Sequence, residues 1–310
     1  MSILIAEHDH SRYAELLRAA EPSLELRGSA DPVELAALAA DCPIWLGQPD
    51  LLVHLLRRGC KPVWAQSTWA GITPLLAAGL PRDYRLTRAV GIFGQVMAEY
   101  VLTYLLAHER EVLARLTSQA LRQWNGRLPH SLAGRRALIV GCGDIGQSVA
   151  SFLAPFGLEL YGIARRPRPL EPFREVAGLE ALGRLVGEAD YVINLLPDTP
   201  ETQDIYDAAL FARFRPSALF INAGRGSAVV DADLVAALKD GHLAGAVIDV
   251  CRQEPLPPRH PFWTAYGLLL TGHSAAPTQP PLMARLFLDN LARYQAGEAL
   301  RGEVDFARGY

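Results

Sequence analysis

The chain has 310 residues, half of them hydrophobic, and a net charge of −3 at pH 7. A chain of this length can bury two sizeable cores, so two domains are expected. The small net charge gives no general electrostatic reason to bind nucleic acid or an acidic membrane surface. No apolar run reaches the roughly 18 residues of a membrane span. Neither nucleic acid nor a membrane is therefore expected as a partner.

The first 90 residues alternate short apolar strands with helices, which predicts a small α/β unit. The strands are expected at Ile3–Glu7, Leu24–Leu26, Ile44–Leu46 and Val63–Gln66. The helices are expected at Ser11–Ala20, with Ser11 as N-cap, and at Asp31–Ala40 and Leu51–Arg57. One long helix then runs from Gln95 to about Trp124, and its first half is apolar nearly all round. That pattern is typical of burial between domains or subunits.

The alternation continues after Gly134 and predicts a doubly wound sheet. Six strands are expected, at Ala137–Gly141, Leu158–Ile163, Tyr191–Leu196, Ala218–Asn222, Gly245–Val250 and Leu268–Thr271. A helix at Asp231–Lys239 lies among them and a last helix follows at Pro281–Gln295. The predicted fold is thus α/β, with two flavodoxin-like or Rossmann-like doubly wound domains. Residues 1–94 and 282–310 would form the substrate-binding domain, and residues 95–281 the dinucleotide-binding domain.

A glycine-rich turn opens the second domain, directly after the first of its strands. Gly141 permits a tight turn, Gly143 lets the backbone approach a pyrophosphate, and Gly146 allows close packing of helix on strand. The helix begins with Asp144 and Ile145, and its N-terminal N–H groups would face the pyrophosphate. The alternative is a purely structural turn. Because a strand precedes the turn and a helix follows it, dinucleotide binding is favoured.

The end of the next strand predicts which dinucleotide is bound. An NAD-binding domain of this type usually carries Asp or Glu there, bonded to the ribose 2′-OH. This chain has Arg165 and Arg166 instead, and guanidinium groups pair with a 2′-phosphate. A solvated basic loop is the alternative. The sequence favours NADP(H), with NAD(H) bound more weakly.

Three polar residues follow the last strands of the second domain, at the edge where such sheets bind ligands. They are Arg225, Glu254 and His273. Arg can hold a carboxylate and polarise a carbonyl, and His can supply the proton that accompanies hydride transfer. A neighbouring carboxylate would favour the protonated imidazole. Each also has a structural alternative: a loop charge capping carbonyls, a cap before Pro255, and a core histidine.

These motifs together resemble the D-isomer-specific 2-hydroxyacid dehydrogenase family, particularly its glyoxylate/hydroxypyruvate reductase branch. The resemblance covers nearly the whole chain and rests on Gly141–Gly146, Leu195–Thr202, Asn222–Gly226, Asp249–Leu256 and His273–Pro277. It implies that Arg225 binds the 2-oxo acid, His273 is the general acid/base and Glu254 pairs with it. It also implies cofactor contacts at Leu196, Pro197, Ala223, Gly224, Arg225, Asp249 and His273, and a homodimer interface on the helix containing Ala98–Leu102.

Two segments depart from the family's pattern. Gly272 stands where the family commonly has Pro before the His, and the substrate loop reads Ser67–Thr73 rather than Gly-x-Gly-Val-Asp. We still expect the N–H groups of Ala70 and Gly71 to receive the substrate carboxylate. Trp45 and Trp69 would form a wall of the pocket, although either could be core packing.

The expected protein is a cytoplasmic NADPH-dependent reductase that converts small 2-oxo acids, glyoxylate and hydroxypyruvate, to D-2-hydroxy acids in a cleft that closes between its domains. A cytoplasmic location is expected because no signal-peptide pattern begins the chain. Cys42, Cys60, Cys142 and Cys251 have no metal-type spacing, so reduced thiols and no metal site are expected. The alternatives are a reductase of bulkier 2-oxo acids, an NAD-linked dehydrogenase, and a cofactor-sensing binding protein that lacks catalysis.

Overall fold

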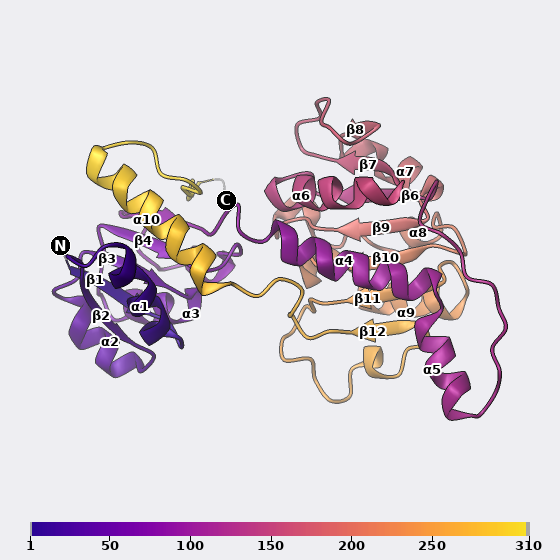
Figure 1. Cartoon of the computed structure of the whole chain (residues 1–310), viewed down its shortest axis with the longest axis horizontal. Helices are drawn as coiled ribbons and strands as arrows, with labels where there is room; N and C mark the ends of the chain where they lie inside the picture. Colours follow the sequence, from indigo (N-terminus) through magenta and orange to yellow (C-terminus); the bar gives the residue numbers. More distant parts are fainter. Residues whose placement is uncertain (1, 308–310) are drawn as a thin grey trace. The chain divides into compact units, whose positions relative to one another are not determined.

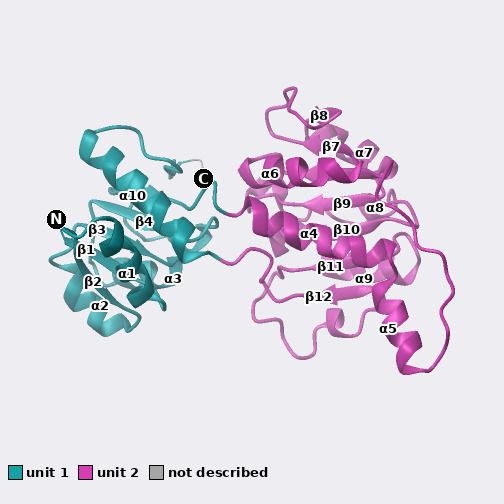
Figure 2. Ribbon diagram, viewed as in Figure 1, with its two compact units in different colours: residues 1–92, 278–310 teal, residues 93–277 magenta. Residues whose placement is uncertain are grey.

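The computed structural model describes residues 2–307 and divides into two compact units. Unit 1 comprises Met1–Ile92 and Thr278–Tyr310, and unit 2 comprises Phe93–Pro277. The chain thus leaves unit 1 once and returns to it (Figure 2). The two divisions lie two and four residues from those expected on sequence.

Unit 1 contains one parallel sheet with strand order β2-β1-β3-β4-β5. Its strands are β1 (Ser2–Ala6), β2 (Glu25–Ser29), β3 (Ile44–Gly47), β4 (Trp64–Ser67) and β5 (Arg85–Thr87). Its helices are α1 (His10–Ala20), α2 (Pro32–Ala39), α3 (Pro49–Arg57) and α10 (Pro280–Ala296), with a 3-10 turn η1 (Thr73–Leu76). This is the flavodoxin-like order, in which ligands bind at the carboxyl edge beside β1 and β3.

The C-terminal helix packs on the sheet of unit 1 rather than on unit 2. Trp64 on β4 stacks against Phe287 and Tyr294 of α10, with ring centroids 5.3 and 5.4 Å apart. The buried Asn290 amide donates to Gln66 Oε1 at 2.8 Å. Burial of these aromatic and amide groups explains why the chain returns to its first unit.

Helix starts follow local capping, and one expected cap is wrong. Asp31 accepts from the N–H groups of Val33 and Glu34, both at 2.9 Å, and so caps α2. Ser11 is not the cap of α1, because that helix already begins at His10 and Asp9 is its N-cap residue.

Unit 2 contains a seven-stranded parallel sheet with order β12-β11-β10-β9-β6-β7-β8. Its strands are β6 (Arg136–Val140), β7 (Glu159–Ile163), β8 (Glu175–Ala177), β9 (Tyr191–Asn194), β10 (Leu219–Asn222), β11 (Gly245–Ile248) and β12 (Leu268–Leu270). Its helices are α4 (Gly94–Glu109), α5 (Val112–Ala120), α6 (Asp144–Leu153), α7 (Leu182–Glu188), α8 (Ala208–Phe211) and α9 (Asp231–Lys239). This is the Rossmann order with an added edge strand, and its switch point lies between β6 and β9.

Helices cover both faces of this sheet (Figure 1). One core contains α4 and α6, through Val101, Leu105 and Val149. The other contains α7, α8 and α9, through Val186 and Phe211 among others. Both faces of the strands are therefore buried, which is why the strands read as continuous apolar runs rather than alternating ones.

The expected single helix from Gln95 to Trp124 is wrong. The structure divides it into α4 and α5, because Glu111 lies in the left-handed region with φ 51°. A left-handed residue reverses the local path, so helical hydrogen bonding cannot continue through it. Within α4 the buried Glu109 accepts a hydrogen bond from the Tyr191 hydroxyl at 2.5 Å, which fixes the helix on the sheet.

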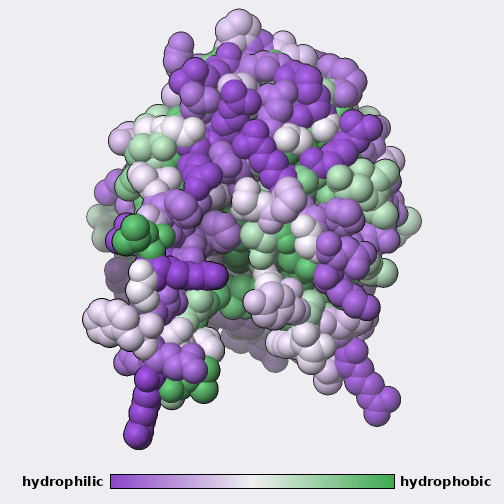
Figure 3. Space-filling view, turned by 90° about the vertical axis from the view of Figure 1, so that its right-hand side faces the viewer, coloured by the Kyte–Doolittle hydropathy of each residue, from purple (hydrophilic) through white to green (hydrophobic). Residues whose placement is uncertain are grey.

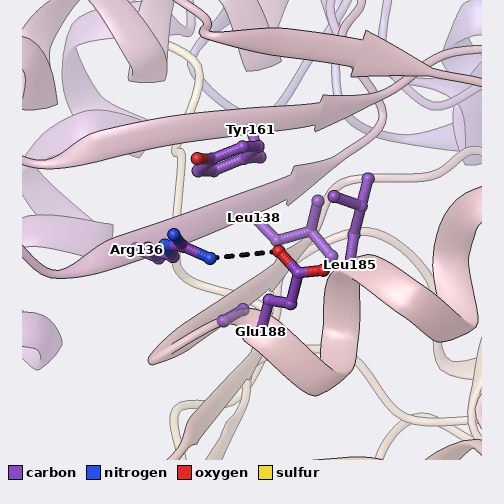
Figure 4. Close-up of a pocket in the computed structure, with 6 residues that line it drawn as sticks. Arg136, Leu138, Tyr161, Leu185 and Glu188 are labelled. Carbon is purple, nitrogen blue, oxygen red and sulfur yellow. Dashed lines mark hydrogen bonds and ion pairs between the residues drawn. The ribbon is translucent and has the colours of Figure 1, made fainter.

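The amino edge of the same sheet is occupied by the chain's own ion pairs. Arg136 on β6 pairs with Glu188 at 3.0 Å and lies over the ring of Tyr161, 5.6 Å from its centroid (Figure 4). Leu138 and Leu185 line the same shallow hollow. These partners leave the opposite, carboxyl edge for ligand chemistry.

Among residues 2–307, no helix is both long and apolar enough to cross a membrane.

Candidate active site

The glycine turn joins β6 to α6 at the switch point of unit 2. Gly141 has φ +111°, and a Cβ there would lie 2.9 Å from the backbone of Leu195. A Cβ on Gly146 would lie 2.2 Å from the carbonyl oxygen of Gly141. Both positions thus require glycine for close backbone packing.

Gly143 differs from its two neighbours in the motif. A Cβ built there meets no atom within 4 Å among the described residues, and its backbone is extended with φ −77°. The chain therefore has no packing reason for glycine at this position. An open side of the backbone at the N-terminus of α6, beside Asp144 and Ile145, suits the close approach of a pyrophosphate.

Cys142 within this turn is a buried filler. Its sulfur occupies the space where a Cβ on Gly162 would stand, at 2.4 Å. Burial raises the pKa of the thiol to about 12, so the sulfur stays protonated and unreactive at neutral pH.

The two arginines expected to select the cofactor follow β7, and both are exposed. Arg165 lies close enough to Glu201 that its charge contributes to lowering the pKa of that carboxyl, after hydrogen bonds to the carboxylate. No acidic residue takes the place of the ribose-binding carboxylate in residues 164–169. The segment is thus suited to a phosphate rather than to a ribose hydroxyl.

Two buried asparagines join the loops after β9 and β10. The Asn194 amide donates to Asn222 Oδ1 at 2.9 Å, and the Asn222 amide donates to the carbonyl of Arg225 at 3.1 Å. The N–H of Gly224 also donates to Asn222 Oδ1. Both side chains are fully buried. This network fixes the backbone that carries Arg225. It was not predicted from the sequence, although the sequence shows that each of the two apolar strands ends in an asparagine.

The Arg225 loop contacts the loops on both sides. A Cβ on Gly224 would lie 2.8 Å from the carbonyl of Leu196, next to Pro197, so that loop and Ala223–Gly224 pack backbone to backbone. The guanidinium of Arg225 donates to the Gly224 carbonyl at 2.6 Å. Arg225 is half-buried and begins a short 3-10 turn, η5 (Gly226–Ala228).

His273 and Glu254 form the pair that the sequence predicts. His273 Nδ1 lies 2.6 Å from Glu254 Oε2, and Glu254 Oε1 accepts from the N–H of Cys251 at 2.8 Å. The His273 side chain is 51% exposed, and within residues 2–307 its Nε2 makes no hydrogen bond. The ring is therefore oriented through one nitrogen and accessible at the other.

Asp249 organises the loop that carries His273. Its Oδ1 accepts from the Thr271 hydroxyl at 2.6 Å and the Ser274 N–H at 2.8 Å, and its Oδ2 accepts from the Ala275 N–H at 3.1 Å. Tyr100 on α4 in turn bonds Thr271 at 2.9 Å. The contact of Asp249 with a nicotinamide stays a prediction, and loop positioning is the role its bonds indicate.

Gly272 has a backbone reason for departing from the family's proline. Its φ is +70°, and His273 itself has φ +56°. Proline is restricted to φ near −65°, so it could not adopt this conformation. The left-handed pair Gly272–His273 turns the chain where the His273 N–H donates to the Asp249 carbonyl at 2.6 Å.

The expectation that Trp45 of unit 1 lines the substrate pocket is wrong. It is fully buried in the core of that unit, and its indole N–H donates to the Cys42 carbonyl at 2.8 Å. It lies on β3, whose four residues are all buried, so its bulk fills the core.

Trp69 is 38% exposed and follows β4. Its N–H donates to Ser67 Oγ at 3.1 Å, and Thr68 before it bonds the buried Glu7. Burial raises the pKa of that carboxyl. Within the described residues, the next N–H groups, those of Ala70 and Gly71, donate no hydrogen bond. Their role toward substrate stays a prediction.

The dinucleotide-type turn and the His–carboxylate pair at one sheet edge define a Rossmann-fold oxidoreductase. Residues 102–275 match the sequence model described as "D-isomer specific 2-hydroxyacid dehydrogenase, NAD binding domain", which covers more than half of the chain. The chain belongs to the D-isomer specific 2-hydroxyacid dehydrogenase family. The resemblance inferred from the motifs and the α/β fold are thereby confirmed.

Relatives place the chain beside one branch of the family. Glyoxylate/hydroxypyruvate reductase A of Serratia proteamaculans is 37% identical over 216 residues, which are 70% of this chain and 69% of that protein. A family protein of Aeromonas salmonicida has a TM-score of 0.93 at 36% identity, covering 98% of this chain and 99% of that one. An NADPH-dependent glyoxylate/hydroxypyruvate reductase of Sinorhizobium meliloti, solved with NADP and sulfate, has a TM-score of 0.87 at 29% identity with 100% of each chain covered.

Proposed function

We propose that the protein catalyses the NADPH-dependent reduction of small 2-oxo acids, with glyoxylate and hydroxypyruvate preferred, to D-2-hydroxy acids. The names of the relatives from Serratia and Sinorhizobium support this substrate class. In this reaction one 2-oxo acid, one NADPH and one proton give one 2-hydroxy acid and one NADP⁺. Bound NADPH would supply the hydride to C2.

The observation that carries the proposal is the contact of His273 with Glu254 at 2.6 Å. The carboxylate orients the ring through Nδ1. Nε2 then holds the proton that passes to the substrate oxygen as C2 accepts the hydride. A sensor that only bound the cofactor would need no such proton donor.

Arg225 would bind the carboxylate of the substrate and polarise its 2-oxo group, because a guanidinium offers paired donors in one plane. The Asn194–Asn222 network beneath it supports this role, since it holds the Arg225 backbone through the 3.1 Å bond to its carbonyl. Trp69, Ala70 and Gly71 are proposed to contact the substrate.

NADP(H) is the proposed cofactor, and NAD(H) is expected to bind more weakly. The open side of Gly143 suits the pyrophosphate, and exposed Arg165 and Arg166 suit the 2′-phosphate. Structures of family members solved with NADPH or NADP support the same choice.

The test is a panel of 2-oxo acids, from glyoxylate to bulky branched ones, assayed with NADPH and NADH at the nicotinamide absorbance. The proposal predicts the highest kcat/KM for glyoxylate or hydroxypyruvate with NADPH. Failure to oxidise NADPH with any of these acids would contradict it, and stronger turnover of bulky acids would correct the substrate class.

We also propose a homodimer. The resemblance places its interface on the helix containing Ala98–Leu102, but Ala98 and Val101 are buried in the core of unit 2, so we assign the interface to α5, which follows α4. On α5 none of the residues is buried, and its exposed Val112, Leu113 and Leu116 continue into Trp124 and Leu128, which are 97% and 86% exposed. Figure 3 faces the side on which α5 lies in Figure 1 and shows green hydrophobic residues among purple ones. Apolar side chains so exposed favour cover by a second copy.

Light scattering after size exclusion tests the homodimer. Leu116→Glu is expected to give monomers, whereas Val33→Glu, an exposed apolar position in unit 1, should leave the dimer intact. A monomeric wild-type protein would contradict the proposal.

A cytoplasmic location is proposed as well, which the four free cysteines support.

A further inference from the structure

Arg252 lies two residues before Glu254, and its partly exposed side chain bonds a neighbouring loop. Its Nε donates to the Val229 carbonyl at 2.8 Å, and a terminal nitrogen donates to the Ser227 carbonyl at 3.1 Å. The same nitrogen pairs with Asp204. The two carbonyls, of Ser227 and Val229, lie in and just after η5, the short turn that begins at Arg225.

The turn that contains Gly226 and the segment that contains Cys251 and Arg252 pack backbone against backbone. A Cβ on Gly226 would stand 2.0 Å from the carbonyl carbon of Cys251 and 2.3 Å from the nitrogen of Arg252. The Cys251 N–H donates to Glu254 Oε1 at 2.8 Å. One short segment therefore contacts the Arg225 turn through Arg252 and carries the His273 partner.

Carboxylates hold the guanidinium in place. Asp231, at the start of α9, lies 3.8 Å from Arg252 Nε and also contacts His260 at 3.2 Å. Together with Asp204, it places anionic oxygens around a side chain that is 37% exposed. A guanidinium with several donors in one plane can bond carbonyls and carboxylates at once, which a Lys ammonium does less well.

We propose that Arg252 is a positioning residue for the reaction, holding the loop of Glu254 in register with the turn of Arg225. The inference rests on the proposed function, because it assigns Arg252 to the geometry of those catalytic groups. Without Arg252, the proton donor pair and the substrate-binding guanidinium lose a shared support. A misplacement of about 1 Å can cost about a hundredfold in rate.

The test compares Arg252→Met with Arg215→Met in the whole protein. Arg215 is a matched control: it is 39% exposed and bonds one carbonyl, that of Gly187, and one carboxylate, that of Asp190, near the amino edge of the sheet. Arg252→Met should lower kcat with hydroxypyruvate by about tenfold to a hundredfold and leave NADPH affinity within about twofold. Arg215→Met should change neither. If Arg252→Met does not fold, Arg252→Lys serves in its place, with a smaller loss.

A double-mutant cycle with Glu254→Gln separates positioning from general stability. Because Arg252 holds the loop that carries Glu254, the double variant should lose less in kcat than the product of the two single losses. Full additivity, or a kcat like that of Arg215→Met, would overturn the role of Arg252 while leaving the proposed function intact. If Glu254→Gln alone kept wild-type turnover, the role of Arg252 and that of Glu254 as the partner of His273 would both fall, whereas a wild-type protein that reduced no 2-oxo acid would contradict the proposed function itself.

Discussion

Alanine at Gly143 and alanine at Gly146 should separate cofactor binding from folding. A methyl group at Gly143 meets no atom within 4 Å, and the extended backbone there accepts alanine. We therefore expect the stability of Gly143→Ala to lie within about 0.5 kcal/mol of wild type. A methyl at Gly146 would stand 2.2 Å from the Gly141 carbonyl oxygen, so overpacking of about 1–3 kcal/mol is expected.

The two variants should therefore differ in opposite ways: one in Tm and the other in NADPH affinity. For a unit of this size, about 1 kcal/mol shifts Tm by about 2–4 °C, so Gly146→Ala should lose about 2–12 °C while Gly143→Ala keeps its Tm. In Gly143→Ala the methyl group would occupy the space that we assign to the pyrophosphate. A clash of about 1.4 kcal/mol or more weakens NADPH binding at least tenfold.

Thermal unfolding and calorimetric titration with NADPH measure both quantities on the same preparations. Wild-type NADPH affinity in Gly143→Ala would refute the assignment of this backbone to the pyrophosphate. A lowered Tm in that variant would instead contradict the open side that the structure gives Gly143.

Three further outcomes test the cofactor preference, the partner of His273 and the substrate loop. Arg165→Glu should reverse the cofactor preference, because each charge-assisted bond contributes about 1.5–3 kcal/mol. Arg168→Glu in the same loop is the control. An unchanged ratio of kcat/KM for NADPH to that for NADH would show that Arg165 does not select the cofactor. Glu254→Gln removes the carboxylate that orients the His273 ring, so kcat for reduction should fall while NADPH affinity stays the same, and a wild-type kcat would show that Glu254 is a structural cap. Trp69→Ala should admit bulkier 2-oxo acids and weaken the smallest ones, whereas an unaltered substrate profile would assign Trp69 to packing.

Sequence patterning predicted the strands that are apolar along their length. The strands at β6, β9, β10 and β11 were found because buried parallel strands read as apolar runs. By contrast, β5 (Arg85–Thr87) and β8 (Glu175–Ala177) were missed, because three residues that include a charged one carry no periodic signal.

Features that depend on tertiary context could not be predicted. Glu111 breaks the long helix through a left-handed conformation that non-glycine residues rarely adopt. Trp45 lies on β3 and Trp69 follows β4, and only the packing shows that Trp45 is buried whereas Trp69 is exposed. The same holds for Arg252, whose partners lie about 20 to 50 residues away along the chain and meet it only in the folded unit.

The central claim is that His273 delivers the proton in NADPH-dependent reduction, and one comparison tests it directly. Turnover of hydroxypyruvate is measured for wild type and His273→Ala, with the dissociation constant of NADPH determined for each. The account predicts a loss of about 10²–10⁴ in kcat with NADPH affinity unchanged. A variant that retained wild-type kcat would contradict it.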